Sequence, residues 1–220
     1  MSVTIGAQSA QLKAAAATQL PADVAAVFRR RAEEMVQRGI PDDVIKVGDR
    51  LPPFTLSDAF DRPVTLDEIT ADGPAVIVFY RGGWCPYCNL ALRTYQQELL
   101  PQLAGFGARL VAISPQGPEE SLTTAMKAAV EYTVLSDPGC RVARDIGLAF
   151  EETEEVMAAQ RLLGLDLTKA NAEAATALPM PTVLIVDTDH VVRFVDVQPD
   201  YTARTEVADI LAALGALPPR

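Results

Sequence analysis

One short apolar run limits what this chain can fold into. Residues 75–80 read Ala-Val-Ile-Val-Phe-Tyr, with Gly73-Pro74 before them and Gly82-Gly83 after them. Because the run has no polar face, it is typical of a β-strand that is buried on both faces of a sheet. Such a strand needs packed layers above and below it, and one large domain is the natural expectation for a chain of 220 residues.

Strand and helix patterns alternate after this run. Pro86 to about Leu103 predicts a helix, because Pro86 stands in the first turn, where its missing N–H costs least. Further elements are expected as strands at 109–114 and 132–136, helices at 118–130 and 140–146, a β-hairpin of strands 181–187 and 191–195, and a closing helix at 205–214. This rhythm predicts an α/β fold with a central sheet flanked by helices.

Two segments depart from the rhythm. Residues 1 to about 45 carry helical patterns that end at Gly39 and Pro41, and they predict an N-terminal helical extension. Residues 151–178 are polar and Ala-rich with a single helical pattern, and they predict a helical insertion over the sheet. The main domain is therefore expected at 46–220.

The N-terminal extension is expected to pack against the domain or against a second copy of the chain, which would make a homodimer. Its Arg29-Arg30-Arg31 cluster lies beside Glu33-Glu34 on a predicted helix. Clusters of mixed charge on a helix are typical of a solvated face, and we interpret this one in that way.

Composition excludes several classes of function. Acidic residues outnumber basic ones by 29 to 19, and the net charge of −10 argues against binding to nucleic acid or to an anionic membrane. No stretch approaches the roughly 18 consecutive apolar residues of a membrane span. The first residues lack the basic and then apolar pattern of a secretory signal. We therefore expect a cytoplasmic protein.

The main chemical motif is the pair Cys85 and Cys88, which follows the buried strand and opens a predicted helix. A thiol with a pKa of about 8.5 is mostly protonated at neutral pH, and a helix N-terminus stabilises the thiolate. The spacing places a second sulfur one turn away, where it can trap the first. Both cysteines are therefore predicted to be catalytic and to cycle between dithiol and disulfide.

A metal site is the structural alternative for these cysteines. It would need about four ligands, and only Cys140 and His190 remain, neither in a second paired motif. We expect no metal and no other cofactor. Cys140 is either a third redox thiol or, as we favour, a buried structural cysteine.

Several residues near the motif are candidates for contact with a substrate. Trp84 and Tyr87 either receive a partner or cover the end of the sheet, and Arg81 either adds positive potential or is solvated. Met180-Pro181 stands at the start of a strand, where a cis bond could bring a backbone edge beside the site, with a plain trans bond as the alternative. The predicted substrate-binding set is Arg81, Trp84, Pro86, Tyr87, Met180 and Pro181.

Residues 78–88 resemble the active-site strand and turn of the thioredoxin superfamily. Other segments are similar to peroxiredoxins: residues 48–56 to their entry strand, Ser136-Asp137-Pro138 to their mid-domain turn, and residues 184–187 to their late strand. The resemblance covers about residues 47–214. It is to the Cys-x-x-Cys branch of the alkyl hydroperoxide reductase and thiol-specific antioxidant family, and it implies a thioredoxin-like fold with a central mixed sheet.

The resemblance to peroxiredoxins implies roles that two substitutions affect. Their pattern Phe-Tyr-Pro-x-x-x-Thr-x-x-Cys, laid from Phe79, places its shielding proline at Arg81, its peroxide-orienting threonine at Cys85 and its peroxide-attacking cysteine at Cys88. The family's distant arginine is missing too, since its position falls near Pro181. That proline instead matches the cis-proline of thioredoxins.

The two resemblances assign the cysteines differently. By similarity to thioredoxins, Cys85 lies nearest the surface and attacks a substrate disulfide, and Cys88 resolves the mixed disulfide. By similarity to peroxiredoxins, Cys88 attacks a peroxide and Cys85 condenses with the resulting sulfenic acid. The sequence leaves both assignments open.

Two functions follow from this motif. The first is an enzyme that reduces peroxides or disulfides and is itself reduced by thioredoxin, glutathione or a similar donor. The second is a non-catalytic redox sensor or binding module, in which the disulfide changes how the N-terminal helices or the insertion pack against a partner.

Overall fold

The computed structural model describes residues 3–218, without the side chains of residues 122 and 125–128. The strands are β1 (Thr55–Asp58), β2 (Pro63–Thr65), β3 (Ala75–Phe79), β4 (Arg109–Ser114), β5 (Thr133–Ser136), β6 (Ala149–Glu151), β7 (Ala177–Pro179), β8 (Thr182–Val186) and β9 (Val192–Val197). The α-helices are α1 (Ile5–Gln19), α2 (Ala22–Arg38), α3 (Leu66–Thr70), α4 (Pro86–Thr94), α5 (Leu100–Leu103), α6 (Pro118–Ala128), α7 (Arg141–Asp145), α8 (Glu154–Leu162), α9 (Leu167–Ala170) and α10 (Val207–Gly215). Shorter helical turns are η1 (Tyr95–Leu99), η2 (Ala104–Phe106), η3 (Pro138–Cys140) and η4 (Ala172–Ala174).

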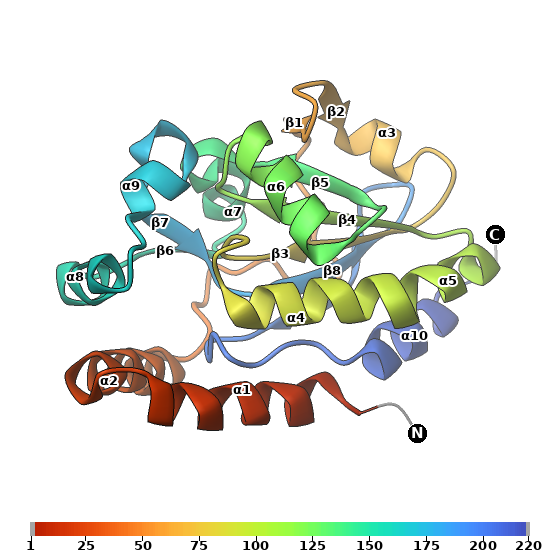
Figure 1. Cartoon of the computed structure of the whole chain (residues 1–220). Helices are drawn as coiled ribbons and strands as arrows, with labels where there is room; N and C mark the ends of the chain where they lie inside the picture. Colours follow the sequence, from red (N-terminus) through yellow and green to blue (C-terminus); the bar gives the residue numbers. More distant parts are fainter. Residues whose placement is uncertain (1–2, 219–220) are drawn as a thin grey trace.

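A mixed sheet forms the centre of the molecule, with the strand order β2-β1-β5-β4-β3-β8-β9 (Figure 1). Strand β3 pairs in parallel with β4 and antiparallel with β8, so the apolar run from the sequence lies between two neighbours. All five residues of β3 are buried. The predictions of a doubly covered sheet and of the late hairpin, observed as β8 and β9, are confirmed.

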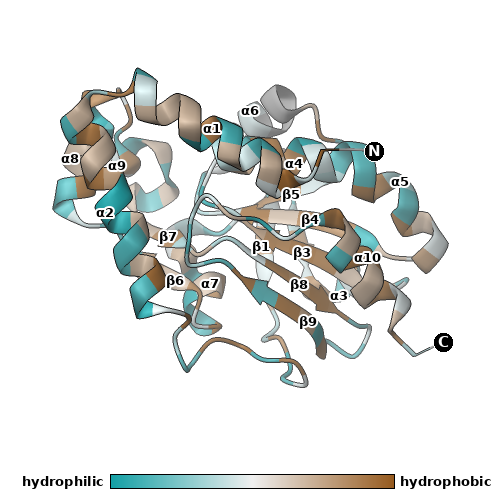
Figure 2. Ribbon diagram, turned by 90° about the horizontal axis from the view of Figure 1, so that it is seen from below, coloured by the Kyte–Doolittle hydropathy of each residue, from teal (hydrophilic) through white to brown (hydrophobic). Residues whose placement is uncertain are grey.

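Two apolar clusters fill the space above and below the sheet. One contains Ile77 and Phe79 with residues of α2, α3 and α7, and the other contains Val76 and Val78 with residues of α1, α4 and α10. Alternate residues of one strand therefore face opposite layers. Figure 2 shows the apolar strands lying inside a layer of helices that carry the polar residues.

The helix expected from Pro86 to Leu103 is present in three parts, α4, η1 and α5. The middle part is a π-helical turn at Tyr95–Leu99. Pro101, which follows it, has no N–H to donate to the preceding turn, and this accounts for the local change of pitch. Leu92, Tyr95 and Leu99 are nevertheless fully buried, so the whole segment covers the sheet.

The N-terminal segment forms the two expected helices. Helix α1 runs beside α4, and its Ile5 joins the cluster of α4 and α10 (Figure 1). The carboxylate of Glu206 accepts hydrogen bonds from the backbone N–H of Ile5 (3.0 Å) and of Gly6 (2.7 Å). The first turn of α1 is thereby attached to the chain just before α10.

The insertion differs from its prediction. It contains two helices, α8 and α9, and its ends pair as a two-stranded ribbon of β6 and β7. It lies beyond the end of the sheet, where α8 packs against α2, and not over a face of the sheet (Figures 1 and 2). Only a few of its apolar side chains are buried, including Val156, Ala159 and Leu167, and this is too little apolar surface to cover a sheet.

Across residues 3–218, none of the helices combines the length and apolar character that crossing a membrane requires.

Candidate active site

The site begins at the sharp turn that joins β3 to α4. A Cβ on Gly83 would lie 2.1 Å from Oγ1 of Thr124, and one on Gly82 would lie 2.4 Å from the indole nitrogen of Trp84. Gly82 also has a φ of +146°, which side chains rarely adopt. The two glycines therefore allow the chain to turn tightly against α6 and place Cys85 at the N-cap of the helix.

Cys85 is the N-cap of α4, Pro86 follows as its first residue, and Cys88 lies in its first turn. Both thiols are free, and both residues are buried, with exposed fractions of 1% and 0%. The expectation that Cys85 lies near the surface is therefore wrong. The reason is tertiary: helix α1 and the segment before α10 pack over this end of α4.

Arg204 supplies a cation to the sulfurs. Its Nη2 donates a hydrogen bond to Sγ of Cys88 at 2.9 Å and lies 4.0 Å from Sγ of Cys85. Its Nη1 donates to the backbone carbonyls of Tyr201 and Ala203. These carbonyls fix the guanidinium in place, and its orientation toward Cys88 favours a thiolate there.

The electrostatic surroundings shift the pKa values of the two cysteines in opposite directions. Burial is the largest single influence on the pKa of Cys88 and by itself would raise it, but a hydrogen bond from the Cys85 thiol opposes this effect. The charges of Arg204 and Arg81 act in the same direction, so the pKa of Cys88 lies well below its ordinary value. The hydrogen bond to Cys88 and then burial raise the pKa of Cys85 well above its ordinary value. The surroundings therefore favour the thiolate at Cys88 and the neutral thiol at Cys85.

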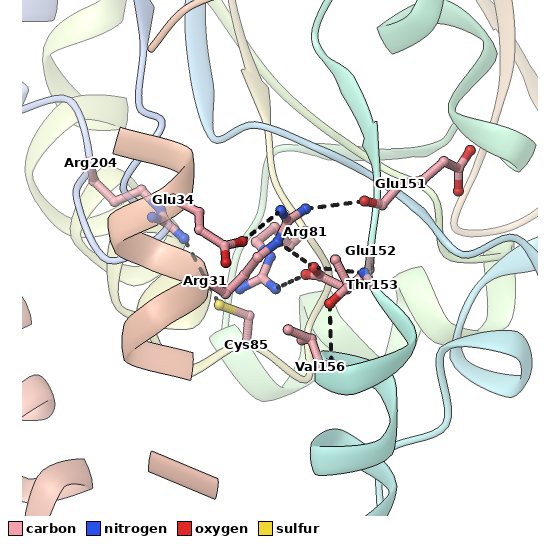
Figure 3. Close-up of polar contacts among 9 residues, drawn as sticks. All are labelled: Arg31, Glu34, Arg81, Cys85, Glu151, Glu152, Thr153, Val156 and Arg204. Carbon is pink, nitrogen blue, oxygen red and sulfur yellow. Dashed lines mark hydrogen bonds and ion pairs between the residues drawn. The ribbon is translucent and has the colours of Figure 1, made fainter. Parts of the chain in front are cut away.

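Arg81 is buried, with an exposed fraction of 5%, and so the alternative of a solvated side chain is wrong. Its guanidinium lies 5.0 Å from the ring centroid of Trp84 and 4.6 Å from that of Tyr201. Its Nη2 lies 3.4 Å from a carboxylate oxygen of Glu152, which comes from the insertion. The two rings and the carboxylate hold the Arg81 charge beside the thiols. Figure 3 shows Arg81 with Glu152 and Cys85.

Aromatic residues form much of the cover. Tyr87 is buried and packs edge-to-face on Tyr201 at 5.8 Å, while Trp84 is half-buried. The predicted candidates Arg81, Trp84 and Tyr87 therefore surround the cysteines. Pro86 lies beside them but is exposed.

Met180 and Pro181 do not have the arrangement beside the cysteines that the sequence suggested. The bond between them is trans, like all peptide bonds among residues 3–218, so the cis alternative is wrong. Met180 extends the β6–β7 ribbon by donating its N–H to Leu148, and the chain enters β8 directly, so it stays extended through Pro181. The side chain of Met180 packs in the cluster on the opposite face of the sheet from the cysteines.

Cys140 also lies in that opposite cluster, and its thiol donates to the carbonyl of Ala177 at 3.4 Å. Burial raises its pKa. It is therefore inert and structural, as favoured from the sequence. In the described part of the chain, no group of three or more His, Cys, Asp or Glu side chains is arranged to hold a metal.

Sequence reasoning missed Arg204 and Glu152. Neither stands in a motif, and Arg204 is 116 positions from Cys88 along the chain. Three neighbouring arginines had been interpreted as a solvated face, yet Arg31 is buried and bonds to Glu152. The only signal for burial was that Arg31 precedes Ala32 directly and stands one helical turn before Met35.

Comparison with solved structures agrees with the fold. The structure is similar to the peroxidoxin BcpB of Mycobacterium tuberculosis, with a TM-score of 0.63 and 23% identity over 80% of this chain and 99% of that one. It is also similar to a peroxiredoxin-like protein of Aquifex aeolicus, with a TM-score of 0.61 and 17% identity over 78% and 87% of the two chains. These similarities and the mixed sheet define a protein of the thioredoxin-like fold with a buried dithiol at the start of a helix.

Sequence comparison identifies the family. Residues 47–195 match the model of the AhpC/TSA family, and the chain belongs to that family. Chloroplastic peroxiredoxin Q of Sedum lineare is 32% identical over 101 residues, which are 46% of this chain and 53% of that protein. The match to the Gentiana triflora protein of the same name is 30% over 97 residues, or 44% of each. The chain thus spans about half the length of these relatives.

Proposed function

We propose that this protein is a thiol peroxidase in which Cys88 reduces a hydroperoxide and Cys85 resolves the product. The observation that supports it is the hydrogen bond from Arg204 to Sγ of Cys88, which favours a thiolate at the position that matches the family's peroxide-attacking cysteine. The raised pKa of Cys85 disfavours the alternative in which Cys85 attacks first.

The first step is a displacement at oxygen. The Cys88 thiolate attacks the outer oxygen of the hydroperoxide, the O–O bond breaks, and the sulfur is oxidised to a sulfenic acid. The inner oxygen leaves with the bonding electrons and becomes an alcohol, or water, after taking a proton from solvent. Arg204 lies where its cationic N–H groups can stabilise the charge that shifts from sulfur to oxygen.

The second step forms the disulfide. The Cys85 sulfur attacks the Cys88 sulfenic acid, an S–S bond forms, and the sulfenic oxygen leaves as water. Two of the interactions that raise the pKa of Cys85 are with the Cys88 thiolate, its hydrogen bond and its negative charge. Both disappear once Cys88 is oxidised, so the first step itself prepares Cys85 for the second. Glutathione, or a dithiol protein such as thioredoxin once the cover over the site has opened, would then reduce the disulfide.

The cover over the site favours a small oxidant. Both sulfurs are buried beneath the ring of Tyr201 and helix α1, so a protein disulfide could reach them only after a large opening. A hydroperoxide needs only a passage of its own width. This difference supports a peroxide over a protein disulfide as the oxidising substrate.

Rapid mixing of the reduced protein with hydrogen peroxide tests the proposal. Trp84 is the only tryptophan and stands next to Cys85 in the chain, so its fluorescence should report oxidation of the site. We expect a fast change that Cys88→Ser abolishes and Cys85→Ser retains. In Cys85→Ser the sulfenic acid should accumulate and react with dimedone.

Cys140→Ser is the matched control, because it removes a thiol from the opposite face of the sheet and should leave the fast change intact. Oxidation no faster than that of a free thiol would exclude a peroxidase. Thiol–disulfide exchange through Cys85 would then become the leading account.

A further inference from the structure

The N-terminal extension reaches the active site through one buried side chain. Arg31 of α2 has an exposed fraction of 6%, although its neighbours Arg29 and Arg30 are exposed. Its Nε donates to Oε1 of Glu152 at 2.8 Å, and its Nη2 donates to the carbonyl of Glu151 at 3.1 Å. Figure 3 shows Arg31, from α2, and Arg81, from the turn after β3, approaching the same carboxylate.

Glu152 divides its carboxylate unequally between the two arginines. Oε1 is 2.8 Å from Arg31, whereas Oε2 is 3.4 Å from Arg81, which is a much weaker contact. Nε of Arg81 is buried and has no hydrogen-bond partner among the described residues. Arg81 is therefore only partly neutralised, and its remaining charge acts on the sulfurs.

The balance of buried charge also favours a thiolate at Cys88. Two buried guanidinium groups, those of Arg31 and Arg81, share the buried carboxylate of Glu152, and the buried guanidinium of Arg204 pairs with no carboxylate among the described residues. A thiolate at Cys88 offsets part of the surplus positive charge. The other titratable groups facing Cys88 are Cys85 from α4 and Tyr80 from the end of β3, and neither is a cation.

We propose that Arg31 is a positioning residue, which binds Glu152 firmly and so keeps Arg81 free to act on Cys88. The N-terminal extension is then part of the electrostatic machinery of the site, and not only a packing arm. This inference deepens the proposed function and rests on it only for its consequence in catalysis. The effect on the thiolate itself can be measured without any peroxide.

Removing the Arg31 side chain should change the pKa of Cys88 in one definite direction. In Arg31→Met, Glu152 loses its closer partner and pairs fully with Arg81, which lies on the other side of the carboxylate. The field of Arg81 at Cys88 weakens, and the pKa of Cys88 rises. Removing Glu152 as well leaves Arg81 without an anion, so the double variant Arg31→Met, Glu152→Gln should recover a low pKa. A residue that served only to fold the protein would give no such recovery.

The test is a pH titration of thiolate ultraviolet absorbance in the full chain, in a Cys85→Ser background. Only Cys88 then titrates at moderate pH, because burial raises the pKa of Cys140. We expect Arg31→Met to raise the midpoint by about one unit, and the double variant to return to the parent midpoint or below it.

Arg30→Met is the matched control, because it removes an equal charge from the same helix at an exposed residue that pairs with Glu155. It should titrate like the parent. Equal midpoints for Arg31→Met and Arg30→Met would overturn the inference, as would a double variant that titrates no lower than Arg31→Met.

The result is independent of the proposed function. If the native protein fails to reduce peroxide but the midpoints move as stated, the proposed function is wrong and the role of Arg31 stands. If Arg31→Met does not fold, the double variant and Arg31→Lys still test the role of Arg31. We expect Arg31→Lys, which keeps the charge, to titrate close to the parent, and a rise equal to that expected for Arg31→Met would contradict the inference.

Discussion

Cys85 and Cys88 occupy one turn of α4, yet their chemistry is opposite. Cys88 accepts hydrogen bonds from Arg204 and from the Cys85 thiol, and these favour its thiolate. Cys85, as the donor of the second bond, is held in the protonated form. In the proposed function, the direction of one hydrogen bond and the position of one guanidinium would therefore make Cys88 the nucleophile.

The pH dependence of peroxide reduction should follow from this assignment. A thiol with a lowered pKa stays ionised below the ordinary range, so the rate should be constant around neutral pH and fall only in acid, as pH drops through the pKa of Cys88. In Arg204→Met, the fall should begin at higher pH, and the rate at neutral pH should drop about tenfold to hundredfold, since a hydrogen bond to a charged group contributes about 1.5–3 kcal/mol.

The rate constant with hydrogen peroxide, measured against pH for both proteins, checks this prediction. Arg193→Met is a control for loss of a guanidinium, because Arg193 pairs with Asp187 at the surface of the late hairpin. An unshifted profile in Arg204→Met would mean that Arg204 does not stabilise the thiolate.

At the scale of elements, α1 is held by few contacts. Only Ile5 and Ser9 of its fifteen residues are buried, so its attachment depends strongly on its first turn. There the carboxylate of Glu206 accepts two backbone N–H groups that the helix itself cannot satisfy, and its charge is favourable at a helix N-terminus.

Glu206→Gln should loosen α1 without unfolding the sheet. We expect faster amide hydrogen exchange in residues 5–19, with the exchange of β3 and β4 unchanged, because the local loss is about 1–2 kcal/mol. Asp209→Asn is the control, since Asp209 is exposed in the first turn of α10 and carries the same charge. If both variants exchange alike, the bonds to α1 contribute nothing measurable.

At the scale of the whole molecule, the redox state should change stability. The ion pair of Arg204 with Cys88 exists only in the reduced protein, and a disulfide would leave a buried guanidinium with backbone carbonyls alone. Burying an unpaired charge is costly, so the oxidised state should be the less stable one.

We therefore expect the reduced protein to melt about 3–10 °C above the oxidised protein at neutral pH, from a charge-assisted bond of about 1.5–3 kcal/mol in a chain of this size. Thermal unfolding of the two forms measures the difference. The difference in melting temperature should be smaller in Arg204→Met, because methionine leaves no unpaired buried charge in the oxidised form. An oxidised form that melts at or above the reduced form would contradict the prediction.

The sequence by itself determined the sheet, the turn and the dithiol. Residues 75–80 specify a buried strand because their side chains leave no polar face, and the glycines, Pro86 and the cysteine spacing specify the helix start, since all of these act over a few neighbouring residues. The predictions of a continuous helix to Leu103 and of an insertion over the sheet were less accurate. The change of helical pitch near a proline depends on fine local geometry, and the two-stranded ribbon depends on pairing between residues that are distant along the chain.

Only the tertiary structure decided how the dithiol works. Arg204 lies 116 positions from Cys88, and Arg31 lies 121 positions from Glu152, so no local pattern could bring either pair together. The burial of both sulfurs depends on the packing of α1 and of the segment before α10. The roles of two cysteines in one helical turn are set by charges and by exclusion of water, and these come from the fold around them and not from the motif itself.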